Sequence, residues 1–155
     1  MDEPTIASNN NGSTGLSRVR IGVLFIAYTI SGTAAGAIFD SLEWSLLIAP
    51  LAPTIAALVL ATRAFPLRLL SAGASIVASV AIAVWLTNGS ASDVVDAFTA
   101  GPQRLLSTDW PSPARPDLIG TVAATLAIAT ALSAELATRR RWHLLPLLPL
   151  FVTYV

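Results

Sequence analysis

Residues 21–39, IGVLFIAYTISGTAAGAIF, decide the fold class of this chain because all nineteen lack a charged side chain. At a helical rise of about 1.5 Å per residue, such a run spans a hydrocarbon core of roughly 30 Å. The composition agrees: 54% of the 155 residues are hydrophobic, 12% are charged, and the mean hydropathy is +0.70. Soluble domains carry about 25% charged residues. We therefore predict an integral membrane protein whose first transmembrane helix lies at 21–39.

Further apolar runs follow, and the charged residues collect between them. The last run has only twelve residues, against the roughly 20 of a full span, so we expect it to be re-entrant or to continue past the sequence given. In the second run, Pro50 and Pro53 predict a kink, or else a discontinuous helix of the transporter kind. The predicted fold is an all-α, polytopic transmembrane helix bundle of four spans plus a short fifth apolar segment, at about 21–39, 45–62, 69–86, 118–137 and 144–155.

Residues 87–117, between the third and fourth spans, are too many for a plain connection. Apolar residues recur there at helical spacing, which predicts a helix at the membrane surface with Ser92 as its N-cap and a break at Gly101-Pro102. Residues 1–20 are rich in Asn, Ser, Thr and Gly and predict a disordered tail, which leaves 21–155 as the transmembrane domain. The apolar residues of the surface helix are Val94, Val95, Phe98, Leu105 and Leu106.

Arginine predicts the orientation, because short loops rich in Arg and Lys stay in the cytoplasm. All nine basic residues are Arg, and only Arg104 and Arg115 lie on the side of the 87–117 loop, together with six of the nine acids. We therefore predict a multi-pass protein of the plasma membrane with a cytoplasmic N-terminus and an external 87–117 loop. The arginines on the predicted cytoplasmic side are Arg18, Arg20, Arg63, Arg68, Arg139, Arg140 and Arg141.

The charge balance and the missing residue types exclude several functions. Nine basic residues match nine acids, so no net positive field exists to hold a nucleic acid. The chain has no Cys and a single His, which removes disulfides, thiolate nucleophiles and the usual metal sites. We therefore expect no cofactor, no metal and no catalytic residue. The expected partners are the lipid bilayer and other membrane or cell-envelope proteins.

Glu135 is the one acid inside a predicted span. An intramembrane carboxylate is a candidate for proton or cation handling. Glu135 lies near the end of its span, however, and Arg139 follows at i+4, the spacing of a helical ion pair. We favour an interfacial pair between Glu135 and Arg139, with proton coupling as the alternative.

Gly32 and Gly36 form a Gly-x-x-x-Gly step in the first span. Small residues at this spacing let two helices approach closely. We predict that the step packs within this bundle, and self-association of two chains is the alternative.

Three stretches resemble the N-terminal membrane region of bacterial transglutaminase-like membrane proteins of the TgpA type, in their actinobacterial form. They are LLSTDWPSPARPDL at 105–118, AELATR at 134–139 and LLPLLP at 144–149. In that family, the resemblance implies, further helices lead to an extracytoplasmic papain-like domain with a Cys, His and Asp triad. This chain has no Cys, so no catalytic residue carries over.

The resemblance implies a non-catalytic membrane anchor, either part of a longer transglutaminase-like cell-envelope protein or a truncated paralogue of one. Two alternatives from the residues stay open: a small transporter or channel subunit, and an assembly subunit of a membrane complex. Transport would need polar side chains that converge within the membrane, and lone hydroxyls in helices usually bond their own backbone. The candidates are Thr29, Ser31, Thr33, Thr54, Ser75 and Ser79.

Overall fold

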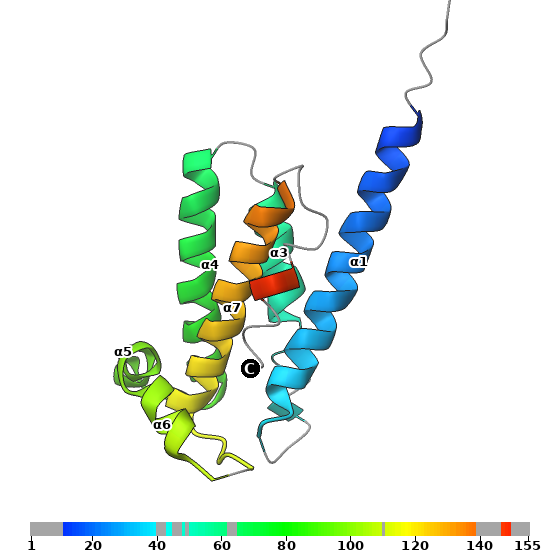
Figure 1. The fold of residues 1–155 in the computed structure, drawn as a ribbon. Helices are drawn as coiled ribbons and strands as arrows, with labels where there is room; N and C mark the ends of the chain where they lie inside the picture. Colours follow the sequence, from blue (N-terminus) through cyan, green and yellow to red (C-terminus); the bar gives the residue numbers. More distant parts are fainter. Residues whose placement is uncertain are drawn as a thin grey trace, which may run out of the picture.

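The computed structural model describes residues 11–39, 43–44, 48, 50–61, 65–109, 111–138 and 147–149. Within these ranges the chain is all-helical and has no strand, as the apolar periodicity predicts (Figure 1). The helices are α1 (Asn11–Gly36), α3 (Leu51–Ala61), α4 (Phe65–Leu86), α5 (Ala91–Thr99), α6 (Gly101–Ser107) and α7 (Pro116–Thr138).

Helix α7 is the centre of the fold and contacts each of the other five helices (Figure 1). Every residue from 117 to 124 is buried. Close packing on several sides is possible because α7 is rich in Ala and carries Gly120. A Cβ at Gly120 would lie 2.9 Å from the Cβ of Ala97 on α5, so only Gly fits there. Helix α7 is therefore the scaffold on which α1, α3 and α4 are held side by side.

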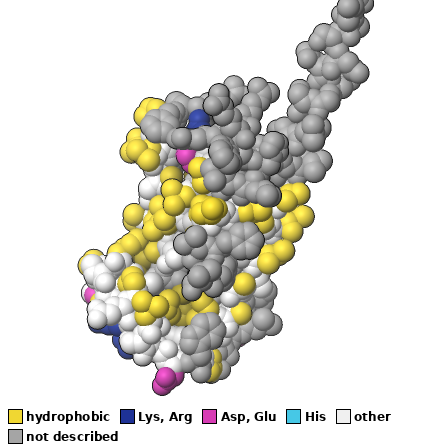
Figure 2. Space-filling view, viewed as in Figure 1, with side chains coloured by type: hydrophobic (Ala, Val, Ile, Leu, Met, Phe, Trp, Pro, Cys, Tyr) yellow, Lys and Arg dark blue, Asp and Glu magenta, His cyan; other side chains and the backbone are white. Residues whose placement is uncertain are grey.

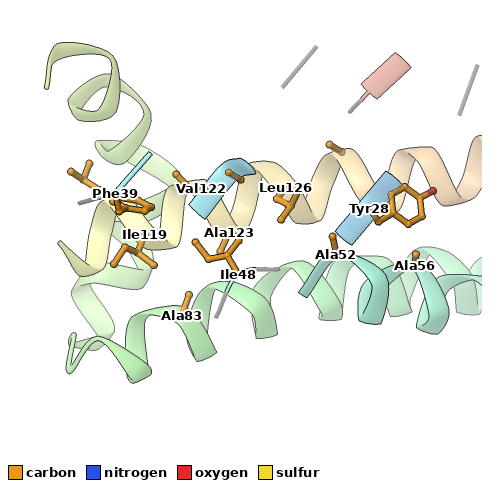
Figure 3. Close-up of a cluster of buried hydrophobic side chains, with 13 residues drawn as sticks. Tyr28, Phe39, Ile48, Ala52, Ala56, Ala83, Ile119, Val122, Ala123 and Leu126 are labelled. Carbon is orange, nitrogen blue, oxygen red and sulfur yellow. The ribbon is translucent and has the colours of Figure 1, made fainter. Parts of the chain in front are cut away.

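The main core lies between α7 and the helices α1, α3 and α4 (Figure 3). Its large members are fully or almost fully buried, and small alanines fill the space between them. This alternation of large and small side chains lets the helices interdigitate, so dispersion contacts are made along the whole interface. The cluster includes Tyr28, Phe39, Ile48, Ala52, Ala56, Ala83, Leu118, Ile119, Val122, Ala123 and Leu126.

Two described helices are long and apolar enough to cross a membrane, at Pro66–Leu86 and Pro116–Ala137. They match the spans predicted at 69–86 and 118–137, and each begins earlier because its proline falls in the first helical turn, where a missing N–H is tolerated. The described residues thus contain two such helices, whereas four spans are predicted. The span predicted at 21–39 falls on α1, which is not one of these two helices, and the span at 45–62 is described only in part, so both stay predictions. Of the segment 144–155 only 147–149 are described.

Helix α1 differs from its predicted bounds at both ends. It begins at Asn11, so residues 11–20, which the composition assigns to a disordered tail, are helical. Adding residues to an existing helix avoids the unfavourable nucleation step, and Arg18 and Arg20 are good helix formers. It ends at Gly36, after which Phe39 pairs with Ser112 in an isolated parallel bridge. The end of α1 is therefore tied to the segment that leads into α7.

The 87–117 loop folds onto the bundle end where α4 stops and α7 starts (Figure 1). Its predicted helix is present but divided, with α5 ending at Thr99 and α6 beginning at Gly101. This confirms the break predicted from Gly101-Pro102. The predicted N-cap is wrong by two residues: Ser90, not Ser92, precedes the first turn of α5 in an extended conformation.

Candidate functional site

An ion pair joins the start of α4 to the end of α7. Arg68 Nη1 donates to Glu135 Oε2 over 3.4 Å, and the two side chains are 18% and 30% exposed. The two helices pack against each other and run in opposite directions (Figure 1), so residues 67 positions apart in sequence come together. The predicted partner of Glu135, Arg139, lies outside the described residues. Sequence spacing gave no signal for Arg68 as a partner.

A cavity of about 380 Å³ lies beside this ion pair. Among the described residues that line it, nearly all are apolar, and Arg68 and Glu135 are the charged ones. Gly73 marks an open part of it, because a Cβ placed there would meet no atom within 4 Å. The other lining residues are Val59, Leu69, Ala72, Ile76, Ile128, Ala131 and Leu132.

A second charged cluster lies at the opposite end of α7. Asp117 is 2% exposed, and its carboxylate accepts a 2.7 Å hydrogen bond from Arg104 on α6 and pairs with Arg115 Nε at 3.4 Å. Arg104 also contacts Asp96 of α5 at 3.4 Å. The hydrogen bond to Asp117, together with the Asp96 carboxylate, raises the pKa of the Arg104 guanidinium. A buried carboxylate is tolerated here because it is paired and lies in the first turn of α7.

The start of α5 is fixed by a reciprocal cap. Asp93 Oδ2 accepts hydrogen bonds from both the backbone N–H and the hydroxyl of Ser90, each 2.7 Å long. These bonds stabilise the charged form and lower the pKa of the Asp93 carboxyl. The cap orients α5 so that Ala97 faces α7, where Thr121 Oγ1 donates to the Ala97 carbonyl at 2.9 Å. The 87–109 region is therefore built onto the helix ends by polar contacts.

The hydroxyls that transport would need do not converge. Five of the six predicted candidates donate to a carbonyl one turn earlier in their own helix, as expected for lone hydroxyls in helices. The bonds are Thr29 to Phe25, Thr33 to Thr29, Thr54 to Pro50, Ser75 to Ser71 and Ser79 to Ser75, at 2.6–2.9 Å. Deeper in the bundle, Tyr28 and Ser133 are fully buried, and their hydroxyls lie next to each other without a well-formed hydrogen bond.

Only some of the remaining predicted residues lie in the described part of the chain. Gly32 and Gly36 are both buried on α1, which packs against α3 and α7; their role as a packing step stays a prediction. Of the arginines predicted to set orientation, Arg68 lies in the first turns of α4. Arg63, Arg139, Arg140 and Arg141 lie outside the described residues. Among the described residues, no group of three or more His, Cys, Asp or Glu side chains could hold a metal ion.

No family model, curated protein or solved structure matches this chain. Its function is therefore argued from the arrangement of its own residues.

Proposed function

We propose that this chain is a non-catalytic, multi-pass integral membrane domain that holds the 87–117 segment at the outer membrane surface. The observation that carries the proposal is the position of charge along α4 and α7. Arg68 and Glu135 form one cluster, and Asp117 belongs to the other. Eighteen residues separate Asp117 from Glu135 on α7, about 27 Å of helix, which is close to the roughly 30 Å of a hydrocarbon core.

The surface between the two clusters is apolar. The segments of α3, α4 and α7 between the levels of these clusters contain no charged residue, and Figure 2 shows hydrophobic side chains across the middle of one face, with Arg, Asp and Glu near its two ends. Only 22% of the apolar window of α4 is buried, against 83% for α7. This difference supports a lipid-facing α4 around a central α7, because soluble proteins rarely expose so continuous an apolar surface. The exposed residues of α4 include Leu67, Leu69, Leu70, Val77, Ile82, Trp85 and Leu86.

Helices α5 and α6 fit the headgroup region at the outer end. Trp85, at the end of α4, is 74% exposed, and Leu106 on α6 is 89% exposed. An amphipathic Trp ring prefers the membrane interface, and apolar side chains on a short surface helix enter the boundary between headgroups and acyl chains. In this proposal the N-terminus is cytoplasmic, since the arginine-poor loop is outside.

The same proposal assigns the domain an anchoring role in the cell envelope. The support is the resemblance of 105–118, 134–139 and 144–149 to transglutaminase-like membrane proteins of the TgpA type. The own-helix hydrogen bonds of the candidate hydroxyls favour an anchor over a transporter.

Cysteine labelling of intact bacterial cells tests location and orientation, because the chain has no native Cys. We expect an impermeant maleimide to label Ser90→Cys in intact cells, and Ser13→Cys only after the cells are opened. The native chain, which has no Cys, is the negative control. Extraction with alkaline carbonate should leave all three proteins in the membrane fraction. Release by carbonate would contradict the membrane location, and labelling of Ser13→Cys alone would reverse the orientation.

A further inference from the structure

We propose that Asn88 is a site of spontaneous deamidation, that the cap at the end of α4 controls its rate, and that the conversion loosens α5. Asn88 is exposed, and Gly89 follows it. Asn is a chemically labile residue, and a following Gly makes it most reactive because no side chain hinders attack by the Gly nitrogen. We base the proposal on the residues between α4 and α5, so it does not depend on the membrane location.

The reaction at Asn88 needs only water. The backbone nitrogen of Gly89 bonds to Cγ of Asn88, the bond from Cγ to Nδ2 breaks, and Nδ2 leaves as ammonia with the proton that the Gly89 nitrogen loses. The product is a cyclic succinimide. Water then adds to either ring carbonyl and opens the ring, which gives Asp or, as the main product, isoaspartate. Isoaspartate places the former Asn88 Cβ in the main chain, so the backbone becomes longer.

The cap of α4 holds the Gly89 nitrogen away from this reaction. Gly89 N–H donates to the Val84 carbonyl over 2.8 Å, and Asn88 N–H donates to the Trp85 carbonyl over 3.1 Å. With a φ of 55° at Asn88, these are the two bonds and the left-handed residue of a Schellman cap. The attacking nitrogen is therefore engaged in the cap and has to leave it before it can bond to Cγ.

Close packing holds the Gly89 backbone in the same position. A Cβ at Gly89 would lie 2.6 Å from side-chain atoms of both Val84 and Pro116. Val84 in turn belongs to a buried cluster with Ala97 of α5. Moving the Gly89 nitrogen onto Asn88 thus requires the end of α4 to open, and helix ends open locally at a much smaller cost than the whole chain. The deamidation rate should follow the fraction of chains that are open.

The converted chain cannot rebuild the cap. The longer main chain of isoaspartate separates the cap donors from their acceptors, and the new carboxylate lies at the C-terminal end of α4, where negative charge is unfavourable. Ser90, which Asp93 holds in place at the start of α5, is the second residue after Asn88. Loss of the α4 cap therefore reaches the start of α5, and the loosening persists because the released ammonia does not return.

The chain contains a matched control site, because the tripeptide Asn-Gly-Ser occurs at both 11–13 and 88–90. The same two residues follow each Asn, so short synthetic peptides of the two sites should deamidate at about the same rate. Asn11 is the first residue of α1, where the backbone N–H groups have no acceptor within their own helix. We therefore expect the fold to slow Asn88 much more than Asn11.

Peptide mapping by mass spectrometry, after incubation of the full chain in micelles at mildly alkaline pH, measures Asp and isoaspartate at both positions. We expect Asn88 to convert at least about tenfold more slowly in the chain than in its peptide, and Asn11 to stay closer to its peptide. Equal slowing at both sites would overturn control by the cap. Conversion at Asn11 alone would overturn the site, and so would a glycan on Asn88, since Asn-x-Ser is also a glycosylation acceptor.

Asp93→Ala tests whether local opening sets the rate. It removes the acceptor that holds Ser90 beside Gly89, so Asn88 should convert about fivefold faster in the full chain, the order of losing one cap. Asp109→Ala removes an exposed carboxylate of the same loop and should leave the rate unchanged. Circular dichroism checks that both variants keep their helices. An unchanged rate in Asp93→Ala, or an equal increase in both variants, would overturn the role of the cap.

The loosening of α5 is tested on converted chains. In the variant Asn11→Gln only Asn88 remains in an Asn-Gly pair, and ion exchange separates the converted chains by their added negative charge. Hydrogen exchange should be faster at the α5 amides of the converted chain and unchanged at residues 117–124 of α7. Equal exchange at α5 in the two fractions, or faster exchange along the whole chain, would overturn a loosening confined to α5.

Discussion

Arg104 Nη1 lies 2.7 Å from the Oδ2 atom of Asp117, and this bond joins α6 to the first turn of α7. Arg115 contacts the other oxygen of the same carboxylate at 3.4 Å. The buried acid thus links two segments of the 87–117 loop to the central helix. Because no other described helix end is held by a carboxylate this deeply buried, the cluster is where we expect the loop to be most sensitive to substitution.

Asp117→Ala should lower the free energy of unfolding by about 2 kcal/mol, since it leaves two guanidinium groups without their shared acceptor. Unfolding in mixed micelles, followed by circular dichroism, measures the change. Asp109→Ala removes an exposed carboxylate from the same loop and should change stability little. Equal losses in the two variants would show that the buried cluster is not what holds the loop.

The cap of α5 should depend on pH in one direction. Its hydrogen bonds lower the pKa of Asp93 from an unfolded value of 3.8, so the folded state favours the ionised carboxylate. The stabilisation is therefore fully present above pH 3.8 and is lost as pH falls from there through the lower folded pKa. Hydrogen exchange of the α5 amides, compared between the native chain and Asp93→Ala, should differ at pH 7 and converge at the lowest pH.

Ser92→Ala provides the control for this cap, because it keeps the carboxylate and leaves Ser90 in place. Its exchange should therefore follow that of the native chain across the whole pH range, and should not resemble that of Asp93→Ala. A gap between native chain and Asp93→Ala that widened toward acid would contradict the assigned direction of the pKa shift.

Hydropathy located the two described helices that are long and apolar enough to cross a membrane, α4 and α7, because it is a local property of the chain. The starts of α4 and α7 were displaced by only four and two residues, where Pro66 and Pro116 enter the first turn. Hydropathy does not identify contacts between residues that are far apart in sequence. Arg68 and Glu135 are 67 positions apart, and no periodicity relates them until the antiparallel packing of α4 and α7 is known.

The glycines show the same difference between features that the local sequence indicates and features that depend on tertiary packing. Gly101 was predictable as a helix break because Pro102 follows it. The close packing of Gly101 against Thr121 was not predictable, because Thr121 comes from another helix. Gly120 was missed altogether, because its need for a hydrogen in place of a Cβ is set by Ala97 and Val84.

Gly101→Ala should destabilise the chain by about 1–3 kcal/mol, the usual effect of overpacking. The added Cβ would overlap Thr121 Oγ1, which donates to the carbonyls of Ala97 and Asp117. The methyl would therefore displace the hydroxyl from both bonds. Gly73→Ala is the control: its Cβ meets open space within a helix, so stability should rise by about 0.5–1 kcal/mol. Thermal unfolding in micelles distinguishes these opposite signs, and a gain for both variants would contradict the close packing of α6 on α7.

The Tyr28 hydroxyl should be dispensable although its ring is not. The side chain is fully buried in the main core (Figure 3), and its oxygen makes no well-formed hydrogen bond, although the Ser133 hydroxyl lies beside it. A buried polar group without a partner is unfavourable, so Tyr28→Phe should leave the free energy of unfolding unchanged or raise it by up to about 1 kcal/mol. Tyr28→Ala should lower it by about 3–5 kcal/mol, because it leaves a cavity between α1 and α7. Ser133→Ala should behave like Tyr28→Phe, since its hydroxyl is also buried without a well-formed hydrogen bond. A loss of stability in both hydroxyl deletions, measured by unfolding in micelles, would show that the neighbouring Tyr28 and Ser133 hydroxyls stabilise the bundle by bonding to each other.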